Sequence, residues 1–257
     1  MELLARARIQ MWQGASLWVV DATQPRGPLP RRTDFHSHHA IQITMSLGGH
    51  FRLATATADV LGEAIAVAAD AEHVFEAEGL IGFIFIEPES RAGRAVSKKL
   101  LNGESLASIP PEMLGDHRKH IAEAYRAPRV DGAKFEALGR ALVTTLSADT
   151  IADEPDARIR KVIAWASQNL DRPISLADAV AVSGLSAGRL RHLFVEQTGL
   201  PFKTYLLWLR LSQALDSFAS GASLTDAAHE AGFSDSAHLS RTFRRMFGIA
   251  PTALKMV

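Results

Sequence analysis

The chain has 257 residues, contains no cysteine and carries 28 Lys/Arg against 28 Asp/Glu. This length predicts one large or two modest domains, of which we favour two, and the lack of cysteine excludes disulfides, thiolate zinc sites and a thiol nucleophile. Its apolar runs fall short of the roughly 18 residues of a membrane span, and the N-terminus MELLARARIQMW lacks the pattern of a signal peptide. We therefore expect a soluble, cytoplasmic protein with no membrane partner.

The charges are distributed unevenly along the chain. Residues 156–257 hold 12 Lys/Arg against 8 Asp/Glu, whereas residues 1–155 hold 16 against 20. An excess of this size permits phosphate binding, but an ordinary solvated surface produces it about as often.

Short apolar stretches dominate the first third of the chain. They are SLWVV, AIQITMSL, HFRLATATADV, EAIAVAAD and LIGFIFIEP. Their Val, Ile, Phe and Thr content and the Gly and Asp residues between them predict strands. We expect a small antiparallel barrel or sandwich within residues 1–90.

The segment FHSHHAIQIT, residues 35–44, concentrates three histidines. Side chains alternate between the two faces of a strand, so His36 and His38 share one face with Gln42, while His39 lies on the other. Without cysteine, only histidine and carboxylate remain as plausible metal ligands. The cluster therefore reduces to a pair of histidines with a third on the opposite face.

A helical pattern begins at Arg91. It includes PEMLGDHRKHIAEAYRAP and AKFEALGRALVTTLSA. In the second segment Phe135, Leu138, Leu142 and Leu146 recur at helical spacing. This apolar face either packs on its own domain, the reading we favour, or pairs two subunits. We assign residues 91–155 to linker or dimerisation helices, with a domain boundary in the acidic segment TIADEPDA.

The last hundred residues contain a duplication. SLADAVAVSGLSAGRLRHLFVEQTG, starting at Ser175, matches SLTDAAHEAGFSDSAHLSRTFRRMFG, starting at Ser223, at an offset of 48 that becomes 49 after the turn. Gly184 matches Gly232 and Phe194 matches Phe243. One residue has thus been added at the turn of the second copy.

Each copy has the features of two short helices joined by a tight turn. Ser175 and Ser223 occupy N-cap positions with Asp three residues later, and Gly184 and Gly232 supply the left-handed turn residue. Ser186 and Ser234 are placed to cap or lead into the second helix. The apolar face of that second helix is predicted to be core: Leu190, Leu193 and Phe194 in the first copy, and Leu239, Phe243 and Phe247 in the second.

The segment between the copies, PFKTYLLWLRLSQALDSFAS, begins with Pro201 and predicts one helix of about 18 residues, roughly 27 Å long. Such a spacer can hold two recognition helices near one DNA turn apart, about 34 Å. The duplication therefore suits binding of two recognition helices to neighbouring turns of DNA.

The run from LADAVAVSG to MFGIAP resembles the DNA-binding domain of AraC/XylS transcriptional regulators, most specifically in AGFSDSAHLSRTFRRMFGIAP and in Arg210 and Ala214. The resemblance covers about the last hundred residues and implies two helix-turn-helix units, within residues 156–257, in adjacent major grooves. By position it implies DNA contacts from Gly188, Arg191, His192, Ser236, Ala237, His238 and Arg241. Gly188 departs from the pattern because it has no side chain. The usual family ending of Pro, two residues, Tyr and Arg is replaced by Pro251, Thr252, Ala253, Leu254 and Lys255.

The resemblance implies an α+β two-domain chain, with a cupin-like N-terminal β-barrel and linker helices followed by an all-α DNA-binding domain. It further implies a small-molecule effector or dimerisation through the barrel, a homodimer, contact with RNA polymerase, and activation rather than repression. On this reading the chain is a regulator and not an enzyme. A cupin enzyme is the least favoured alternative because of the duplicated helix-turn-helix.

Cupin metal sites resemble His-x-His with Glu four residues later and a further His on a later strand. Here His36 and His38 match, Gln42 replaces the Glu, and His73 lies about where the last ligand is expected. We therefore assign His36, His38, Gln42 and His73 to an effector pocket. Two readings stay open: a barrel lined by histidines with no cofactor, which we favour, or a metal-responsive regulator holding zinc or nickel on His36, His38 and His73.

Overall fold

A computed structural model describes residues 5–22, 32–128 and 131–257. The chain divides into two compact units. The first comprises Met1–Ala152 together with Phe243–Val257, and the second comprises Asp153–Thr242. Among the described residues, no helix has both the length and the apolar character needed to cross a membrane.

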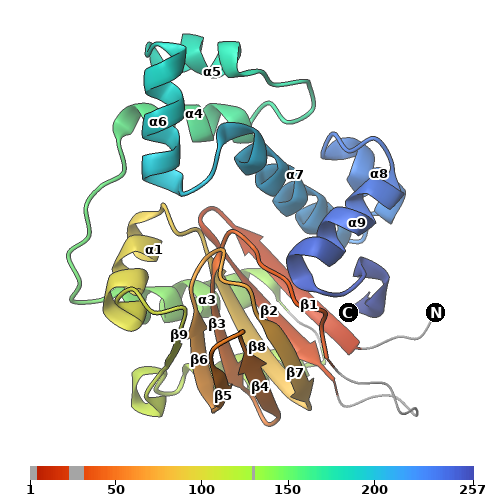
Figure 1. Ribbon diagram of the computed structural model, residues 1–257. Helices are drawn as coiled ribbons and strands as arrows, with labels where there is room; N and C mark the ends of the chain where they lie inside the picture. The colour runs from red at the N-terminus through yellow and green to blue at the C-terminus, as the bar shows by residue number, and fades with distance from the viewer. Residues whose placement is uncertain (1–4, 23–31, 129–130) are drawn as a thin grey trace. The chain divides into compact units, whose positions relative to one another are not determined.

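The first unit contains two β-sheets (Figure 1). The larger has the order β10-β1-β2-β8-β3-β6-β9 and the smaller the order β5-β4-β7. Neighbouring strands pair antiparallel except β1 and β10, which are parallel. The bounds are β1 (Ala5–Trp12), β2 (Ala15–Asp21), β3 (Ile41–Ser46), β4 (His50–Ala54), β5 (Asp59–Leu61), β6 (Ala64–Val67), β7 (Val74–Glu78), β8 (Leu80–Ile86), β9 (Leu106–Ser108) and β10 (Leu254–Met256).

Strand β8 is buried over its whole length because both of its faces are covered. Ile84 joins a core that also contains Phe135 of helix α3 (Gly132–Ser147). On the other face, the rings of Phe83 and Phe75 of β7 lie 5.1 Å apart. The predicted strand-rich N-terminal domain is confirmed, and it is built as two hydrogen-bonded sheets rather than one closed barrel.

The helices of the first unit cover the large sheet. They are α1 (Arg91–Val96), the π-helical turn η1 (Ser97–Leu101), the short turn η2 (Pro111–Met113), α2 (His117–Arg126) and α3. The apolar face predicted for α3 is buried in this unit, and at Gly139 a methyl group would collide with the ring of Trp12 on β1. The face thus packs on its own domain, as we favoured, and is not open to a second subunit.

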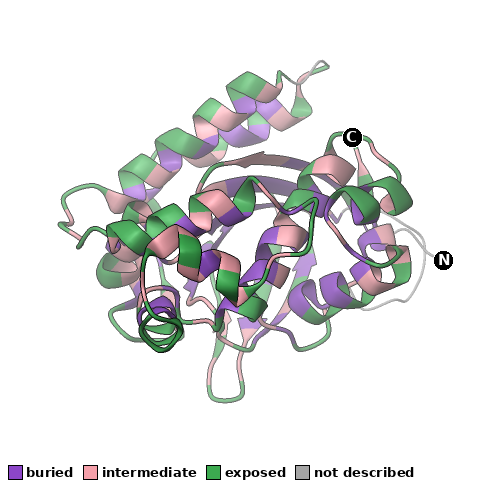
Figure 2. Ribbon diagram, turned by 90° about the horizontal axis from the view of Figure 1, so that it is seen from above, coloured by how far each residue is buried: buried purple, intermediate pink, exposed green. Residues whose placement is uncertain are grey.

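The second unit is helical. Its helices are α4 (Ala157–Ser167), α5 (Leu176–Ser183), α6 (Ala187–Thr198), α7 (Phe202–Ala219), α8 (Leu224–Glu230) and the first part of α9 (Ser236–Phe247). Buried residues follow one side of these helices and exposed residues the other (Figure 2). The spacer α7 has the expected 18 residues, which corresponds to about 27 Å.

The chain returns to the first unit at the end of α9. After the short turn η3 (Pro251–Ala253), Leu254–Met256 forms β10 and pairs with Ala5–Ala7 of β1. The sequence predicts one DNA-binding domain over residues 156–257, whereas residues 243–257 belong to the same compact unit as the sheets. The physical reason is this pairing of β10 with β1, together with the apolar contacts of Phe247.

Candidate functional site

The first helix-turn-helix unit consists of α5 and α6. Ser175 and Asp178 form a reciprocal capping box, in which the Ser175 hydroxyl accepts from the Asp178 amide at 3.3 Å and the Ser175 amide donates to the carboxylate at 2.8 Å. Gly184 ends α5 with a φ of 68°, and Ser186 caps α6. The predicted caps and turn of the first copy are therefore confirmed.

The second unit consists of α8 and α9. Ser223 caps α8, and Gly232 turns the chain with a φ of 71°. Helix α9 is capped by Asp235, whose carboxylate accepts from the His238 amide at 2.6 Å. The cap falls one residue later than Ser234, because the residue added to the second copy shifts the helix start.

Arg210 of α7 supports the second turn, a role that the sequence did not reveal. Its guanidinium donates to the carbonyl of Gly232 at 3.1 Å and to that of Arg172 at 3.4 Å. A side chain at position 232 would also press on this guanidinium and on the carbonyl of Leu170. Arg210 thus fixes the spacer helix to the turn before α9.

The predicted DNA-contacting residues lie on outward faces. Gly188, Arg191 and His192 of α6 are exposed, as are Ala237 and Arg241 of α9. The residues predicted as core are buried: Leu190, Leu193, Phe194, Leu239, Phe243 and Phe247. The arrangement leaves one face of each second helix available to a partner.

Ser236 and His238 differ from that set because both are half-buried. His238 already contacts its own turn, with its ring 5.1 Å from that of Phe233 and its Nδ1 3.3 Å from the Ser234 hydroxyl. These contacts orient the imidazole, so its freedom to adapt to a partner is smaller than that of Arg241.

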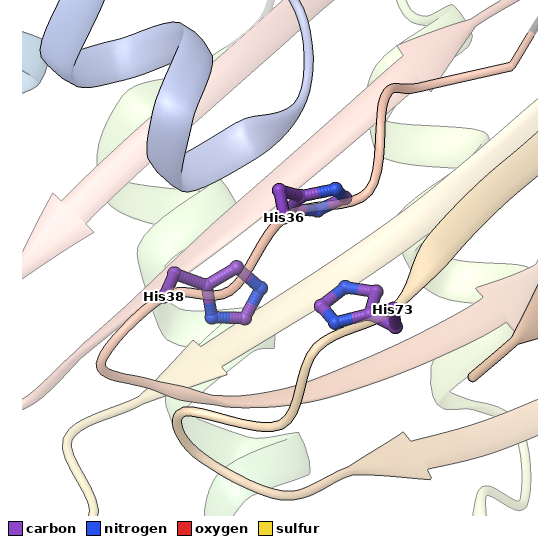
Figure 3. Close-up of side chains that lie close together, drawn as sticks. All are labelled: His36, His38 and His73. Atoms are coloured by element: carbon purple, nitrogen blue, oxygen red, sulfur yellow. The ribbon is translucent and has the colours of Figure 1, made fainter. Parts of the chain in front are cut away.

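In the first unit, His36, His38 and His73 come together, and His39 does not join them (Figure 3). All three are buried, and one ring nitrogen from each lies within 4.8 Å of the others. His36 and His73 pair their backbones in an isolated antiparallel bridge, with N to O distances of 3.0 and 2.9 Å. Residues 35–40 precede β3 rather than extending it, yet the predicted separation of His39 holds.

Burial sets the charge of these imidazoles. Desolvation, and then the neighbouring His73, lower the pKa of His36 to about 4, and the same causes hold the pKa of His38 well below its usual value. The pKa of His73 is likewise lowered by burial. The cluster is therefore neutral at pH 7, the form in which imidazole binds metals.

His39 has the opposite character. Burial lowers its pKa, but hydrogen bonds to Asp70 and Glu89 outweigh that effect and raise the pKa to about 9. Its Nδ1 lies 2.8 Å from the Asp70 carboxylate. His39 is thus a cation held in an ion pair and is not available as a ligand.

An apolar pocket lies next to the histidine cluster. Its cavity volume is about 90 Å³ and it is partly open to solvent, which is smaller than a typical small-molecule site, so it accommodates a small ligand or one end of a larger one. The lining residues are Trp18, Val20, Thr33, His36, Gln42, Phe75, Phe83, Phe85, Phe247, Ile249 and Leu254. Of the residues predicted for an effector pocket, His36 and Gln42 line it, and His38 stacks on Phe247 with the ring centres 5.6 Å apart. The contribution of Phe247, Ile249 and Leu254 was missed, because nothing in the sequence indicates that they return to the sheets.

Comparison with known proteins gives relatives for both parts. Residues 179–256 match the family described as "Helix-turn-helix domain". The chain is 33% identical over 127 residues to the HTH-type transcriptional activator RhaS of Klebsiella pneumoniae (strain 342), a match covering 48% of this chain and 46% of RhaS. The matched region thus spans about half the length of this curated relative.

Two structures of ToxT from Vibrio cholerae resemble the whole chain in fold. Apo ToxT carrying K231A is 12% identical, with a TM-score of 0.60, and the match covers 95% of this chain and 97% of that one. Wild-type ToxT described as bound to an unsaturated fatty acid is 11% identical, with a TM-score of 0.55 and coverage of 96% and 93%. The two-part fold is therefore shared with a solved protein.

Proposed function

We propose that this chain is a regulator of the AraC/XylS type that binds specific DNA sequences and regulates transcription, because its residues 179–256 match the helix-turn-helix family and its C-terminal half is similar to a transcriptional activator. The observation that carries this proposal is the duplicated unit. Each of its second helices, α6 and α9, is capped, packed on one side and exposed on the other.

The proposed contacts are made by the exposed faces. Arg191 and Arg241 reach furthest and match the preference of arginine for guanine edges in the major groove, while His192 and Ser236 offer further donors. His238, held by its turn, helps to place α9. Gly188 and Ala237 present no polar group and instead allow the backbone to approach the DNA closely.

The spacing of the two units supports binding across neighbouring grooves. Helix α7 is about 27 Å long, close to the roughly 34 Å of one DNA turn once the turns at its ends are added. We therefore expect a binding site with two recognised blocks about one turn apart.

We further propose that the chain responds to a small, largely apolar effector in the pocket beside the histidines. Aromatic walls supply apolar contact area, and His36 and Gln42 supply polar contacts for one end of a ligand. The fatty acid described for ToxT is a ligand of this kind. Because Phe247 lines the pocket and is also the last residue of α9, a ligand there alters the packing of a recognition helix directly.

The remaining parts of the proposal follow from the family. We expect a homodimer that contacts RNA polymerase, activates transcription and acts in the cytoplasm by binding rather than by catalysis. RhaS, which matches the C-terminal part, is named a transcriptional activator.

Selection of bound sequences from a random DNA library tests the proposal. The full chain should enrich a motif of two blocks separated by about 10 to 10.5 base pairs. A variant carrying Arg191→Ala and Arg241→Ala should keep its circular dichroism spectrum and enrich none. Failure of the unaltered chain to enrich any motif, or equal enrichment by the double variant, contradicts the proposal.

A further inference from the structure

Three imidazoles converge at a buried point of the first unit, and the DNA-binding function does not use them. His36 and His38 come from the segment before β3, and His73 comes from the segment before β7. Burying three polar rings between two separate segments carries a desolvation free energy that apolar side chains in the same place would not have. A bound group that interacts favourably with the three rings would offset this free energy.

The hydrogen bonds fix which ring nitrogens are available. In each ring Nδ1 lies next to a backbone carbonyl: Asp34 at 2.8 Å from His36, Ala40 at 3.1 Å from His38, and Ala71 at 2.8 Å from His73. Only a protonated Nδ1 can donate to a carbonyl, so Nε2 of each neutral ring carries a lone pair. The same contact of Nδ1 with a carbonyl orients histidine ligands around metals.

Two of these Nε2 atoms lack an ordinary protein donor. In the part of the chain that the structure describes, Nε2 of His73 is buried and has no hydrogen-bond partner. Nε2 of His38 lies 3.0 Å from the side-chain oxygen of Gln42, whose NH2 group donates to the Thr44 hydroxyl at 2.8 Å. A lone pair facing a carbonyl oxygen is unfavourable unless a cation lies between them or the Gln42 amide is turned over. Turning the Gln42 amide over would satisfy His38 but would leave His73 without a partner.

The distances suit a small cation after modest inward rotation of the rings. Ligands placed about 2.0 to 2.1 Å from a tetrahedral zinc ion lie about 3.3 Å from one another. The His38 to Gln42 separation of 3.0 Å is near this value, and one ring nitrogen of each histidine lies within 4.8 Å of the others, which leaves a gap of at most about 1.5 Å. Rotation about the side-chain bonds closes a gap of this size.

We propose that His36, His38 and His73 bind one zinc ion through their Nε2 atoms, with the side-chain oxygen of Gln42 as the fourth ligand. Neutral imidazole suits zinc and nickel, and the absence of a carboxylate makes the site weaker than one with a glutamate at position 42. The four proposed ligands include none of the residues proposed to contact DNA.

The ion would also stabilise the end of α9. A methyl group at Gly248 would lie 2.7 Å from Nδ1 of His36, so the imidazole and the residue after α9 are in direct contact. Fixing His36 on an ion therefore restricts the segment on which the end of the recognition helix rests. Zinc would thus affect the packing of the end of α9, as the apolar effector is proposed to do.

Metal content of the full chain, purified without a histidine tag, provides the test. After the protein is loaded with zinc and dialysed exhaustively, we expect inductively coupled plasma mass spectrometry to find one zinc ion per chain. His73→Ala and the more conservative His73→Gln should each weaken zinc binding at least about tenfold in competition with a coloured chelator. His50→Ala removes an exposed histidine, 78% accessible, and should leave zinc binding unchanged.

Gln42→Glu gives a gain-of-binding test. A carboxylate at this position should strengthen zinc binding about tenfold or more, because oxygen anions are better zinc ligands than amides. Without zinc the same variant should melt at a lower temperature than the unaltered chain, since it buries an unpaired charge, and zinc should raise its melting temperature by the larger amount.

Two results overturn the inference. One is zinc content well below one per chain in a folded, unaltered protein. The other is zinc content that His73→Gln leaves unchanged, which would place the ion elsewhere. DNA binding measured on the same samples separates the two proposals, because a metal-free protein that still selects its DNA motif refutes the zinc site alone.

Discussion

Replacement of Gly248 by alanine is the sharpest test of how residues 243–257 pack on the sheets. Gly248 follows α9 with a φ of 69°, a conformation that costs an ordinary residue about 1 to 2 kcal/mol. The added methyl group would also lie 2.5 Å from the Asp34 carbonyl oxygen and 2.7 Å from Thr33 Cβ. These are backbone and near-backbone atoms, so relief requires the chain to move, at a cost of about 1 to 3 kcal/mol. We expect Gly248→Ala to lower the free energy of unfolding by about 2 to 5 kcal/mol.

Gly115→Ala is the matched control in the same unit. Gly115 has a φ of 47°, but a methyl group there meets no atom within 4 Å. Alanine at this position should therefore lower the free energy of unfolding only through the backbone conformation, by about 1 to 2 kcal/mol. Alanine also restricts the unfolded chain, which offsets part of this loss. Chemical denaturation followed by tryptophan fluorescence, to which Trp12 and Trp18 of the first unit contribute, measures both variants. Equal losses for the two would refute the packing of Gly248 against residues 33–36.

Three further predictions concern the helical unit. Arg241→Ala should weaken binding to the selected DNA motif by about 1 to 3 kcal/mol in a gel-shift titration while leaving the melting temperature unchanged, because Arg241 is exposed; unchanged affinity would show that this face of α9 does not meet the bases. Leu239→Ala should cost about 2 to 5 kcal/mol in chemical denaturation, because Leu239 is 2% exposed and its loss leaves a cavity; a normal unfolding curve would mean that the faces of α9 are assigned the wrong way round. Ser223→Ala removes the cap of α8 and should cost about 1 kcal/mol, with Ser223→Thr as the variant that restores stability; equal curves for both would assign no role to the hydroxyl.

The helical unit could be predicted from the sequence because its signals are local. A serine followed three residues later by aspartate specifies a helix start, and Gly184 or Gly232 specifies the turn, without reference to distant parts of the chain. Ser234 was predicted to cap or lead into α9; it leads into the helix, and the cap is Asp235, at the point where the duplication is imperfect. The prediction that these helices contact DNA through named residues stays a prediction.

The sheet unit was predicted in part. Strand β1 was missed, although Ala5, Ala7 and Ile9 alternate with polar residues in the period of a strand. Alternation correctly separated His39 from His36 and His38, but the position of His73 rested on resemblance to cupins. Strand β10 has three residues and acquires its structure only from β1, so no local pattern reveals it. For the same reason, the sequence does not predict that Phe247 and Leu254 line the pocket.

The parallel pairing of β10 with β1 imposes an order on synthesis and folding. Residues 153–242 form a continuous stretch and can fold as soon as they leave the ribosome, whereas the outer edge of β1, at Ala5–Ala7, stays unpaired until residues 254–256 have been made. Until then one edge of the large sheet exposes unpaired backbone groups, the kind of edge at which chains aggregate. A chain truncated just after α9 would still contain the whole recognition helix. Its large sheet would keep an unpaired edge, however, and we therefore expect such a chain to aggregate with other copies of itself.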